Sequence, residues 1–186
     1  MTCIAAYKDI NGDIYIGGDS IGVLDYTYLT VKEPKIFRRK NMVFGYTTSF
    51  RMGQILQYDF EIPSHHSEMK TNEYLVGVFI PRLISKFEET KFSKIEDNQA
   101  IGGQFLIGYD KKIFLVEPGF AVLEIDANYN ACGCGEDFAK AAFWMMENKK
   151  IKPKERVITA LECASAHSLV KPPFHILKLP GNSGLN

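Results

Sequence analysis

The order of strand-like and helix-like segments in this 186-residue chain predicts an α+β protein with a four-layer αββα sandwich. The segments run as strands, two helices, strands, two helices and a final strand. Grouped strands favour antiparallel sheets over alternating βαβ units, and each sheet would then be covered by one pair of helices. No linker-like or low-complexity stretch interrupts this order, so we expect residues 1–186 to form one domain.

The strands are predicted from short runs rich in β-branched and aromatic residues that end at turn-forming residues. The Asn11-Gly12 step favours a tight hairpin turn, and the segments 38–40 and 109–111 separate two further pairs of runs. The expected strands are residues 3–7, 14–18, 35–37, 41–46, 103–108, 112–116, 120–125, 129–132 and 174–179.

Four helices are predicted, over residues 50–60, 71–87, 136–148 and 154–167. The apolar residues of the first share one face: Met52, Ile55, Leu56 and Phe60. The second begins at the capping residues 71–73 and contains Pro81, which predicts a kink. The third carries an apolar stripe made of Phe138, Ala141, Ala142 and Met145. Pro153 opens the fourth.

Composition and charge exclude several classes of partner. The 22 Lys and Arg residues balance 22 Asp and Glu residues, which argues against nucleic-acid or anionic-membrane binding and leaves self-association open. The longest apolar stretch, residues 74–84, is interrupted by polar and helix-breaking residues and is too short to span a bilayer. The N-terminus lacks the pattern of a secretory signal, and Cys132-Gly133-Cys134 is neither a zinc pair nor a disulfide framework, so a cytoplasmic location is expected.

Thr2 is the first candidate for chemistry. Aminopeptidases remove methionine ahead of a small residue, which would leave Thr2 with a free α-amine beside its hydroxyl. Such an amine has an ordinary pKa of about 7.7–8.0 and can act as the base that a threonine nucleophile needs. A Met-Thr start is also common in proteins without any such activity, so Thr2 needs partners.

Two charged residues fall where a hairpin would bring them to Thr2. Asp19 follows the Gly17-Gly18 end of the second strand, and antiparallel pairing places this end beside the start of the first strand. Lys35 begins the next strand-like run, and its alternation points it toward the same edge. A buried ammonium there would stabilise an alkoxide and lower the pKa of the amine. Each residue alone also fits an ordinary turn or a solvated strand.

The chain resembles the proteasome β-subunit and HslV family over nearly its whole length, and is most similar to the small proteasome-like proteins of bacteria and phages. Thr2 and the strand after it look like the family's mature start, and Asp19 and Lys35 match its Gly-Asp and catalytic-lysine positions. Gly45 matches a glycine whose neighbourhood, here including Thr47 and Thr48, binds substrate and supplies oxyanion-hole amides. Residues 133–135 and the alanine-rich helix behind them are similar to the family's Gly-Ser-Gly turn.

The sequence departs from the family at three places. Cys134 stands where the family has a serine near the threonine amine. Residues 164–170 lack the family's aspartate, so His167 or Ser168 would have to replace it. Asp19 and Lys35 each lie one position further from Thr2 than the family's spacing. Counting from Cys3 removes that difference and makes Cys3 the alternative nucleophile, although removal of Met1 exposes Thr2.

The resemblance implies an N-terminal nucleophile hydrolase, a threonine-type peptidase that works in a self-compartmentalising homo-oligomeric ring and can be fed polypeptide by an ATPase unfoldase. No cofactor is implied, and His65-His66 lacks a third ligand at metal-binding spacing. Two alternatives from other classes stay open. One is a catalytically silent ring or scaffold protein that keeps the fold, and the other is a non-proteolytic hydrolase of small amides.

Overall fold

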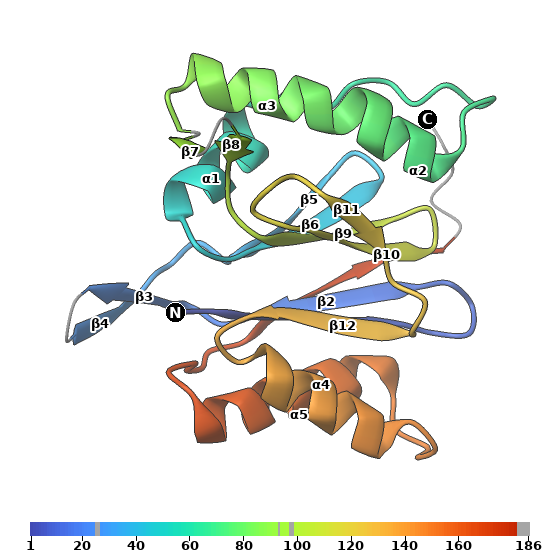
Figure 1. The fold of residues 1–186 in the computed structure, drawn as a ribbon. Coiled ribbons are helices and arrows are strands. Elements are labelled where there is room, and N and C mark those ends of the chain that lie inside the picture. Colours follow the sequence, from blue (N-terminus) through green and yellow to red (C-terminus); the bar gives the residue numbers. More distant parts are fainter. Residues whose placement is uncertain (25–26, 93, 97–98, 182–186) are drawn as a thin grey trace.

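The predicted αββα sandwich is confirmed. The computed structural model describes residues 1–24, 27–92, 94–96 and 99–181. Two sheets lie face to face, and each carries helices on its outer side (Figure 1). The N-terminus lies at one end of the sheets, next to a hairpin that projects beyond the layers (Figure 1).

The first sheet has four strands in the order β12-β1-β2-β13, all antiparallel to their neighbours. Its strands are β1 (Cys3–Lys8), β2 (Ile14–Gly18), β12 (Tyr129–Gly133) and β13 (His175–Leu179). The strand that begins the chain is therefore central and is paired on both sides. The residues before β1 are held close to the ends of β2 and β12 because Cys3 pairs with Gly133 and Ile4 pairs with Gly18.

The second sheet has five strands in the order β11-β10-β9-β6-β5, again antiparallel. Its strands are β5 (Ile36–Arg39), β6 (Met42–Tyr46), β9 (Phe105–Tyr109), β10 (Lys112–Val116) and β11 (Val122–Glu124). The predicted strands are thus confirmed with shifts of one or two residues at their ends. The two sheets meet through a buried aliphatic cluster that includes Ile4, Ile16 and Leu106.

Helices cover the outer face of each sheet. The first sheet carries α4 (Glu136–Met146) and α5 (Pro153–His167), and the second carries α1 (Phe50–Gln54), α2 (Thr71–Tyr74) and α3 (Ile80–Glu89) (Figure 1). Two π-helical turns, Ile55–Asp59 and Leu75–Phe79, follow α1 and α2 directly. The second of them ends two positions before Pro81, whose missing N–H interrupts the regular hydrogen-bond ladder of the helix. Within the described ranges, none of the helices has the length and apolar character needed to cross a membrane.

Two hairpins were not predicted. They are β3 (Ile21–Leu24) with β4 (Thr27–Thr30), and β7 (Lys94–Glu96) with β8 (Gln99–Ile101). All of β4 is exposed, so its residues show no alternation between a buried and a solvated face. The β3–β4 hairpin matters for function because it leaves the body of the protein directly after Asp19 and Ser20.

Most of the apolar stripe predicted for the third helix faces solvent. In α4 the buried residues are Ala139, Phe143 and Met146, whereas Phe138, Ala141 and Met145 are exposed. Of the predicted stripe, Ala142 alone packs against the core, where it is half-buried. The first predicted helix is correct in this respect, since its apolar face is buried.

Gly45 lies between the sheets, where a side chain has no room. A Cβ atom at this position would lie 2.4 Å from Ile4 Cγ2 and 2.9 Å from Ile16 Cδ1. We expect Gly45→Ala to lower the free energy of unfolding by roughly 1–3 kcal/mol, because the overpacked strands must shift. Urea unfolding measures this, and Gly77→Ala is the matched control, since nothing lies within 4 Å of a Cβ there. Equal stability of the two variants would contradict the observed packing.

Candidate active site

Three residues predicted from the sequence meet at one end of the two sheets. Thr2 directly precedes β1, Asp19 directly follows β2, and Lys35 directly precedes β5. The antiparallel pairing of β1 with β2 brings the first two together, while Lys35 reaches across from the second sheet. Exposed fractions of 8%, 0% and 2% show that all three side chains are buried.

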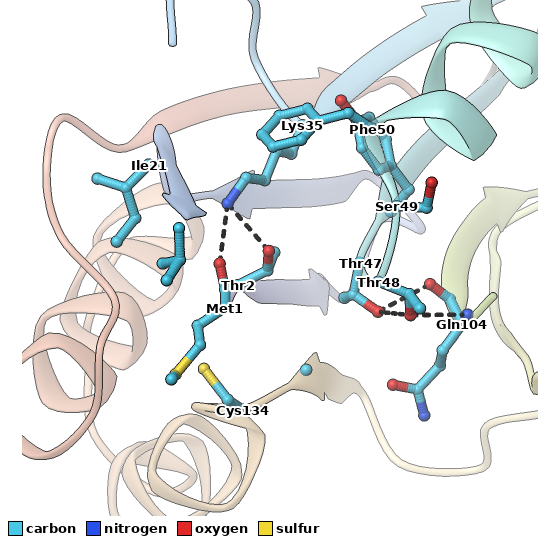
Figure 2. Close-up of a pocket in the computed structure, with 13 residues that line it drawn as sticks. Met1, Thr2, Ile21, Lys35, Thr47, Thr48, Ser49, Phe50, Gln104 and Cys134 are labelled. Atoms are coloured by element: carbon cyan, nitrogen blue, oxygen red, sulfur yellow. Dashed lines mark hydrogen bonds between the residues drawn. The ribbon is translucent and has the colours of Figure 1, made fainter. Parts of the chain in front are cut away.

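The ammonium group of Lys35 is the centre of this arrangement. Its Nζ donates to Thr2 Oγ1 at 2.9 Å and to the carbonyl oxygen of Met1 at 3.2 Å (Figure 2). It also donates to Asp19 Oδ2 at 2.8 Å. A lysine has three N–H donors, so these contacts use all of them. The Thr2 hydroxyl therefore lies directly against a buried positive charge.

Asp19 fixes the lysine and ties the site to the backbone. Its Oδ1 accepts from the N–H of Cys3 at 3.0 Å, and its Oδ2 accepts from the N–H of Ile21 at 3.2 Å as well as from Lys35. These bonds hold the carboxylate between the start of β1 and the start of β3. A buried ion pair with this many hydrogen bonds is rigid, because neither partner can move without leaving a charge unpaired.

Burial governs the acidity of Lys35. Desolvation lowers the pKa of its ammonium below the ordinary lysine value, while the neighbouring Asp19 carboxylate acts in the opposite direction. The ring of Phe50 lies over the same ammonium, with Nζ 5.7 Å from the ring centroid. An aromatic face favours the charged form of a lysine.

A cavity of about 340 Å³ opens beside Thr2 and Lys35. Apolar side chains from β3 and from the start of α1 form part of its wall, among them Ile21, Val23 and Phe50. Met1 and Cys134 lie along another part of it (Figure 2). The Thr2 hydroxyl is thus buried in the protein but reachable through a pocket of the size that binds small ligands and single side chains.

The segment after β6 forms a further wall with a strained backbone. Thr48 has a φ of 69°, which is unusual for a β-branched residue. The N–H of Thr47 donates to Gln104 O at 3.0 Å, and the N–H of Ser49 donates to Thr47 O at 2.7 Å. Strained residues of this kind gather at functional sites, where the surrounding structure holds them in place. Here Gln104 supplies that support, since its N–H also contacts Thr48 Oγ1 at 3.4 Å.

The last residue of β12 and the turn after it complete the pocket. Gly133 has a φ of 95°, and a Cβ atom there would lie 2.3 Å from the carbonyl oxygen of Thr2. Only glycine allows the backbone of β12 to approach Thr2 this closely. The next residue, Cys134, is exposed and lines the pocket together with Met1 and Thr2.

The structure does not bring Gly45 to the pocket. It faces the aliphatic cluster between the sheets, so the pocket is lined instead by the residues that follow it, Tyr46 to Phe50. Gly45 was predicted to help bind substrate, but in the structure it allows the two sheets to pack closely. Thr47 and Thr48, predicted for the same role, do line the pocket.

Cys3 does not fit its alternative role as nucleophile. Its side chain is fully buried in the cluster between the first sheet and its helices, and burial raises the pKa of its thiol. Its N–H serves as a donor to Asp19. Although the family's spacing counted from Asp19 and Lys35 would start at Cys3, the residue that lines the pocket is Thr2.

The two candidate replacements for the missing aspartate lie elsewhere. His167 is exposed, and its ring stacks on Phe138 at a centroid distance of 5.2 Å. The Ser168 hydroxyl donates to Ala164 O at 2.7 Å, which caps the end of α5. Neither residue lines the pocket, so neither takes over a contact to Thr2 in this structure.

Sequence reasoning missed several pocket residues. Gln104 precedes β9 by one position, and Phe50 begins α1, so both enter the pocket through tertiary packing. Ile21 and Val23 were missed because the β3–β4 hairpin was not predicted. Within the described ranges, no group of three or more His, Cys, Asp or Glu side chains is placed to hold a metal ion.

Solved structures share this architecture. The BPH protein of Thiobacillus denitrificans superposes with a TM-score of 0.80 at 18% identity, over 97% of this chain and 98% of that one. A second structure of that protein, in complex with epoxomicin, gives the same values. HslV from Trypanosoma brucei superposes with a TM-score of 0.68 at 15% identity, over 96% of this chain and 99% of that one.

The chain has the proteasome/HslV-like fold. No protein-family model and no curated protein sequence matches it, so the likeness lies in the structure. The superposition covers both sheets, including the strand ends that position Thr2, Asp19 and Lys35. The αββα class predicted from the sequence is therefore confirmed.

Proposed function

We propose that the chain is a threonine-type amide hydrolase that cleaves polypeptides, with Thr2 as the nucleophile once Met1 is removed. The observation that carries the proposal is the position of Lys35 Nζ, 2.9 Å from Thr2 Oγ1 and 2.8 Å from Asp19 Oδ2, at the base of an open pocket. The complex of the structurally similar Thiobacillus protein with epoxomicin supports the same proposal.

The α-amine of Thr2 serves as the base. Thr2 Oγ attacks the scissile carbonyl carbon, its proton passes to the amine, and the amine returns it to the leaving nitrogen as the C–N bond breaks. A water molecule then attacks the Thr2 ester, with the amine again taking and returning the proton, which releases the carboxylic acid and restores the hydroxyl. Lys35 stays protonated and stabilises the negative charge that develops on Oγ, while Asp19 orients Lys35. With Met1 attached, the Thr2 nitrogen belongs to a peptide bond and cannot accept a proton. Removal of Met1 also frees the Lys35 donor that now contacts Met1 O.

The oxyanion of the tetrahedral intermediate needs donors from the wall formed by residues 46–49. The amides of Thr47 and Ser49 are engaged in backbone hydrogen bonds, so we assign the oxyanion contact to the N–H of Thr48. Thr48 is also the residue of this wall that has a positive φ, 69°. Cys134 is assigned to the side of the pocket where the free amine would lie, as a weak partner in proton transfer.

The resemblance in fold to HslV supports a homo-oligomeric ring that encloses the Thr2 sites. A zero formal net charge is compatible with self-association. An ATPase unfoldase that feeds such a ring, and a cytoplasmic location for it, are further predictions from the family resemblance. All four cysteines lie in the described ranges as free thiols, which suits a reducing compartment.

A catalytically silent ring protein is the second candidate. The observation that favours it is that neither His167 nor Ser168 lines the pocket, which leaves the family's aspartate without the expected replacement. Intact mass spectrometry of protein from the native host separates the two candidates, since only loss of methionine creates the free amine.

Hydrolysis of fluorogenic peptides tests the proposal directly. We expect the chain that starts at Thr2 to cleave an unfolded-type peptide and to be inhibited by epoxomicin, with the inhibitor mass found on the Thr2 peptide. Small amides without flanking residues should be poor substrates, because remote binding in the pocket contributes to the rate. Turnover of small amides without turnover of peptides would favour the non-proteolytic alternative and contradict the proposed substrate.

The pH dependence of this hydrolysis should reveal Lys35. Since burial lowers the pKa of Lys35, the alkaline loss of kcat/KM should occur below the ordinary value of 10.5, as the ammonium loses its proton. Asp19 raises that pKa, so Asp19→Asn should move the alkaline limb to lower pH. Asp13→Asn is the matched control, because Asp13 pairs with Lys178 and not with Lys35. An alkaline limb that stays in place in Asp19→Asn would exclude Lys35 as the titrating group.

A further inference from the structure

Phe50 contacts the Lys35 ammonium in a different way from the hydrogen-bonding residues of the site. Lys35 Nζ lies over the ring face of Phe50, 5.7 Å from the ring centroid. Its three N–H groups are already directed at oxygen atoms of Thr2, Asp19 and Met1. The ring therefore adds an attraction between the positive charge and the electron-rich aromatic face, which acts on the charge as a whole and not through one N–H bond.

Local structure fixes the ring of Phe50 at this place. The hydroxyl of Ser49 caps α1, so Phe50 is the first residue of the helix and its backbone is held. The ring packs edge-on against Tyr46, with a centroid distance of 6.3 Å and an interplanar angle of 77°, which is a preferred aromatic arrangement. Burial raises the pKa of Tyr46 to about 12, so this neighbour of the ring stays uncharged.

Two glycines leave room for the pair of rings. A Cβ atom at Gly53 would lie 2.2 Å from Tyr46 Cζ, and a Cβ atom at Gly22 would lie 3.3 Å from Phe50 Cε2. Gly53 belongs to α1 and Gly22 belongs to β3, so the helix and the hairpin both hold the pair. Phe50 is nonetheless 39% exposed, because it lines the pocket. The ring thus reaches Lys35 from a fixed position at the wall of the pocket.

The other groups that act on the charge of Lys35 come from different elements. Desolvation lowers the pKa of Lys35, whereas Asp19, which follows β2, and Cys134, which follows β12, raise it. Cys3 in β1 acts in the same direction as Asp19, but burial raises the pKa of its thiol and keeps it neutral. Phe50 differs from these residues because it opposes desolvation without a charge of its own.

We propose that Phe50 is a positioning residue for the reaction at Thr2, because its ring face keeps Lys35 charged and directed at Thr2 Oγ. The inference rests on the proposed function, in which the ammonium stabilises the negative charge on Oγ. It adds that the ring sets the upper end of the pH range in which the site works. Without the aromatic face, desolvation is less opposed, so Lys35 loses its proton at a lower pH.

A ring of the same shape with the opposite charge distribution separates electrostatics from packing. Pentafluorophenylalanine at position 50 keeps the apolar ring, but its fluorine atoms withdraw electron density from the ring face. We expect Lys35 in this protein to lose its proton about 0.5–1.5 lower on the pH scale than in the chain with phenylalanine. The same replacement at Phe138 is the matched control, since that ring is 38% exposed and stacks on His167 and not on a lysine.

An NMR titration of lysine side chains labelled with ¹³C at Cε follows the charge on Lys35 without any hydrolysis. All proteins compared are full chains that retain Met1 and carry Cys134→Ser, which removes the titration of the neighbouring thiol. Lys35→Arg keeps the charge and identifies the Lys35 signal by its loss. Equal titration of Lys35 with either ring at position 50 would overturn the inference, as would an equal change caused by the replacement at position 138.

Variants made of natural amino acids test the same point in the chain that begins at Thr2. Phe50→Leu keeps an apolar side chain without a ring and should move the alkaline limb of kcat/KM to lower pH, whereas Phe50→Tyr should keep the limb in place. A changed KM with an unmoved limb in Phe50→Leu would show a packing role alone and overturn the inference. If Lys35 responds to the ring in the NMR titration but no preparation hydrolyses peptide, the proposed function fails and the electrostatic role of Phe50 stands.

Discussion

Thr2→Ala is expected to abolish peptide hydrolysis, with a loss of kcat of about 10⁴-fold or more. The substitution removes the attacking oxygen and leaves the α-amine, Lys35 and Asp19 in place. Its effect on folding should be small, because Thr2 precedes β1 and its hydroxyl accepts a hydrogen bond from Lys35 at the edge of the pocket, outside the strands and helices. Initial rates with a fluorogenic peptide, corrected for folded protein by circular dichroism, provide the measurement.

Thr2→Ser is the matched variant for this experiment. It keeps a hydroxyl within reach of Lys35 Nζ and should retain measurable hydrolysis. Rates for Thr2→Ala equal to those of the wild type would show that the nucleophile lies elsewhere. In that case Cys134 would be examined first, since it is exposed in the same pocket.

The second large effect is expected for Lys35→Met, which should lose both activity and stability. The variant removes the positive charge beside Thr2 Oγ and leaves Asp19 as a fully buried, unpaired carboxylate. Breaking one side of a buried ion pair costs about 3–5 kcal/mol of the free energy of unfolding. Urea denaturation at neutral pH measures this loss, and the peptide assay measures the loss of turnover.

A double-mutant cycle separates the two roles of Lys35. Combining Lys35→Met with Asp19→Asn removes the unpaired charge and keeps one of the two acceptor oxygens, so either the N–H of Cys3 or the N–H of Ile21 retains its hydrogen bond. The double variant should therefore regain part of the stability and none of the activity. If Lys35→Met proved as stable as the wild type, the Lys35–Asp19 pair could not be the buried pair described above.

The layer order could be predicted because it follows from local patterns. Alternating β-prone runs, the Asn11-Gly12 turn and the helices opened by capping residues or proline each depend on neighbouring residues only. The β3–β4 hairpin lacks such a pattern, since β4 is exposed on both faces. The face of α4 was misjudged for a related reason. An apolar stripe predicts burial, and α4 has two of them.

The centre of the candidate site was predictable because it depends on strand ends. The start of β1 must lie beside the end of β2, which brings Thr2 to Asp19 whatever the rest of the chain does. Lys35 needed the family resemblance as well, since it belongs to the other sheet. The pocket walls could not be read from the sequence, because Phe50 and Gln104 meet Thr2 only through the packing of the two sheets.

The remaining errors in the site share one physical cause. Sequence position does not show which face of a strand or helix a residue occupies when both faces are covered. Gly45 faces the contact between the sheets, and Cys3 faces the helices of the first sheet. His167 and Ser168 lie at the end of α5, where their side chains contact Phe138 and Ala164.

The central claim is that Thr2 works through its own α-amine, and a pair of preparations that differ only in Met1 tests it most directly. One is the chain that retains Met1. The other is produced from a ubiquitin fusion cleaved during expression, so that Thr2 is the first residue, and intact mass spectrometry verifies both. The account predicts peptide hydrolysis by the chain that begins at Thr2 and none by the chain that retains Met1. Equal hydrolysis by the two preparations would contradict it.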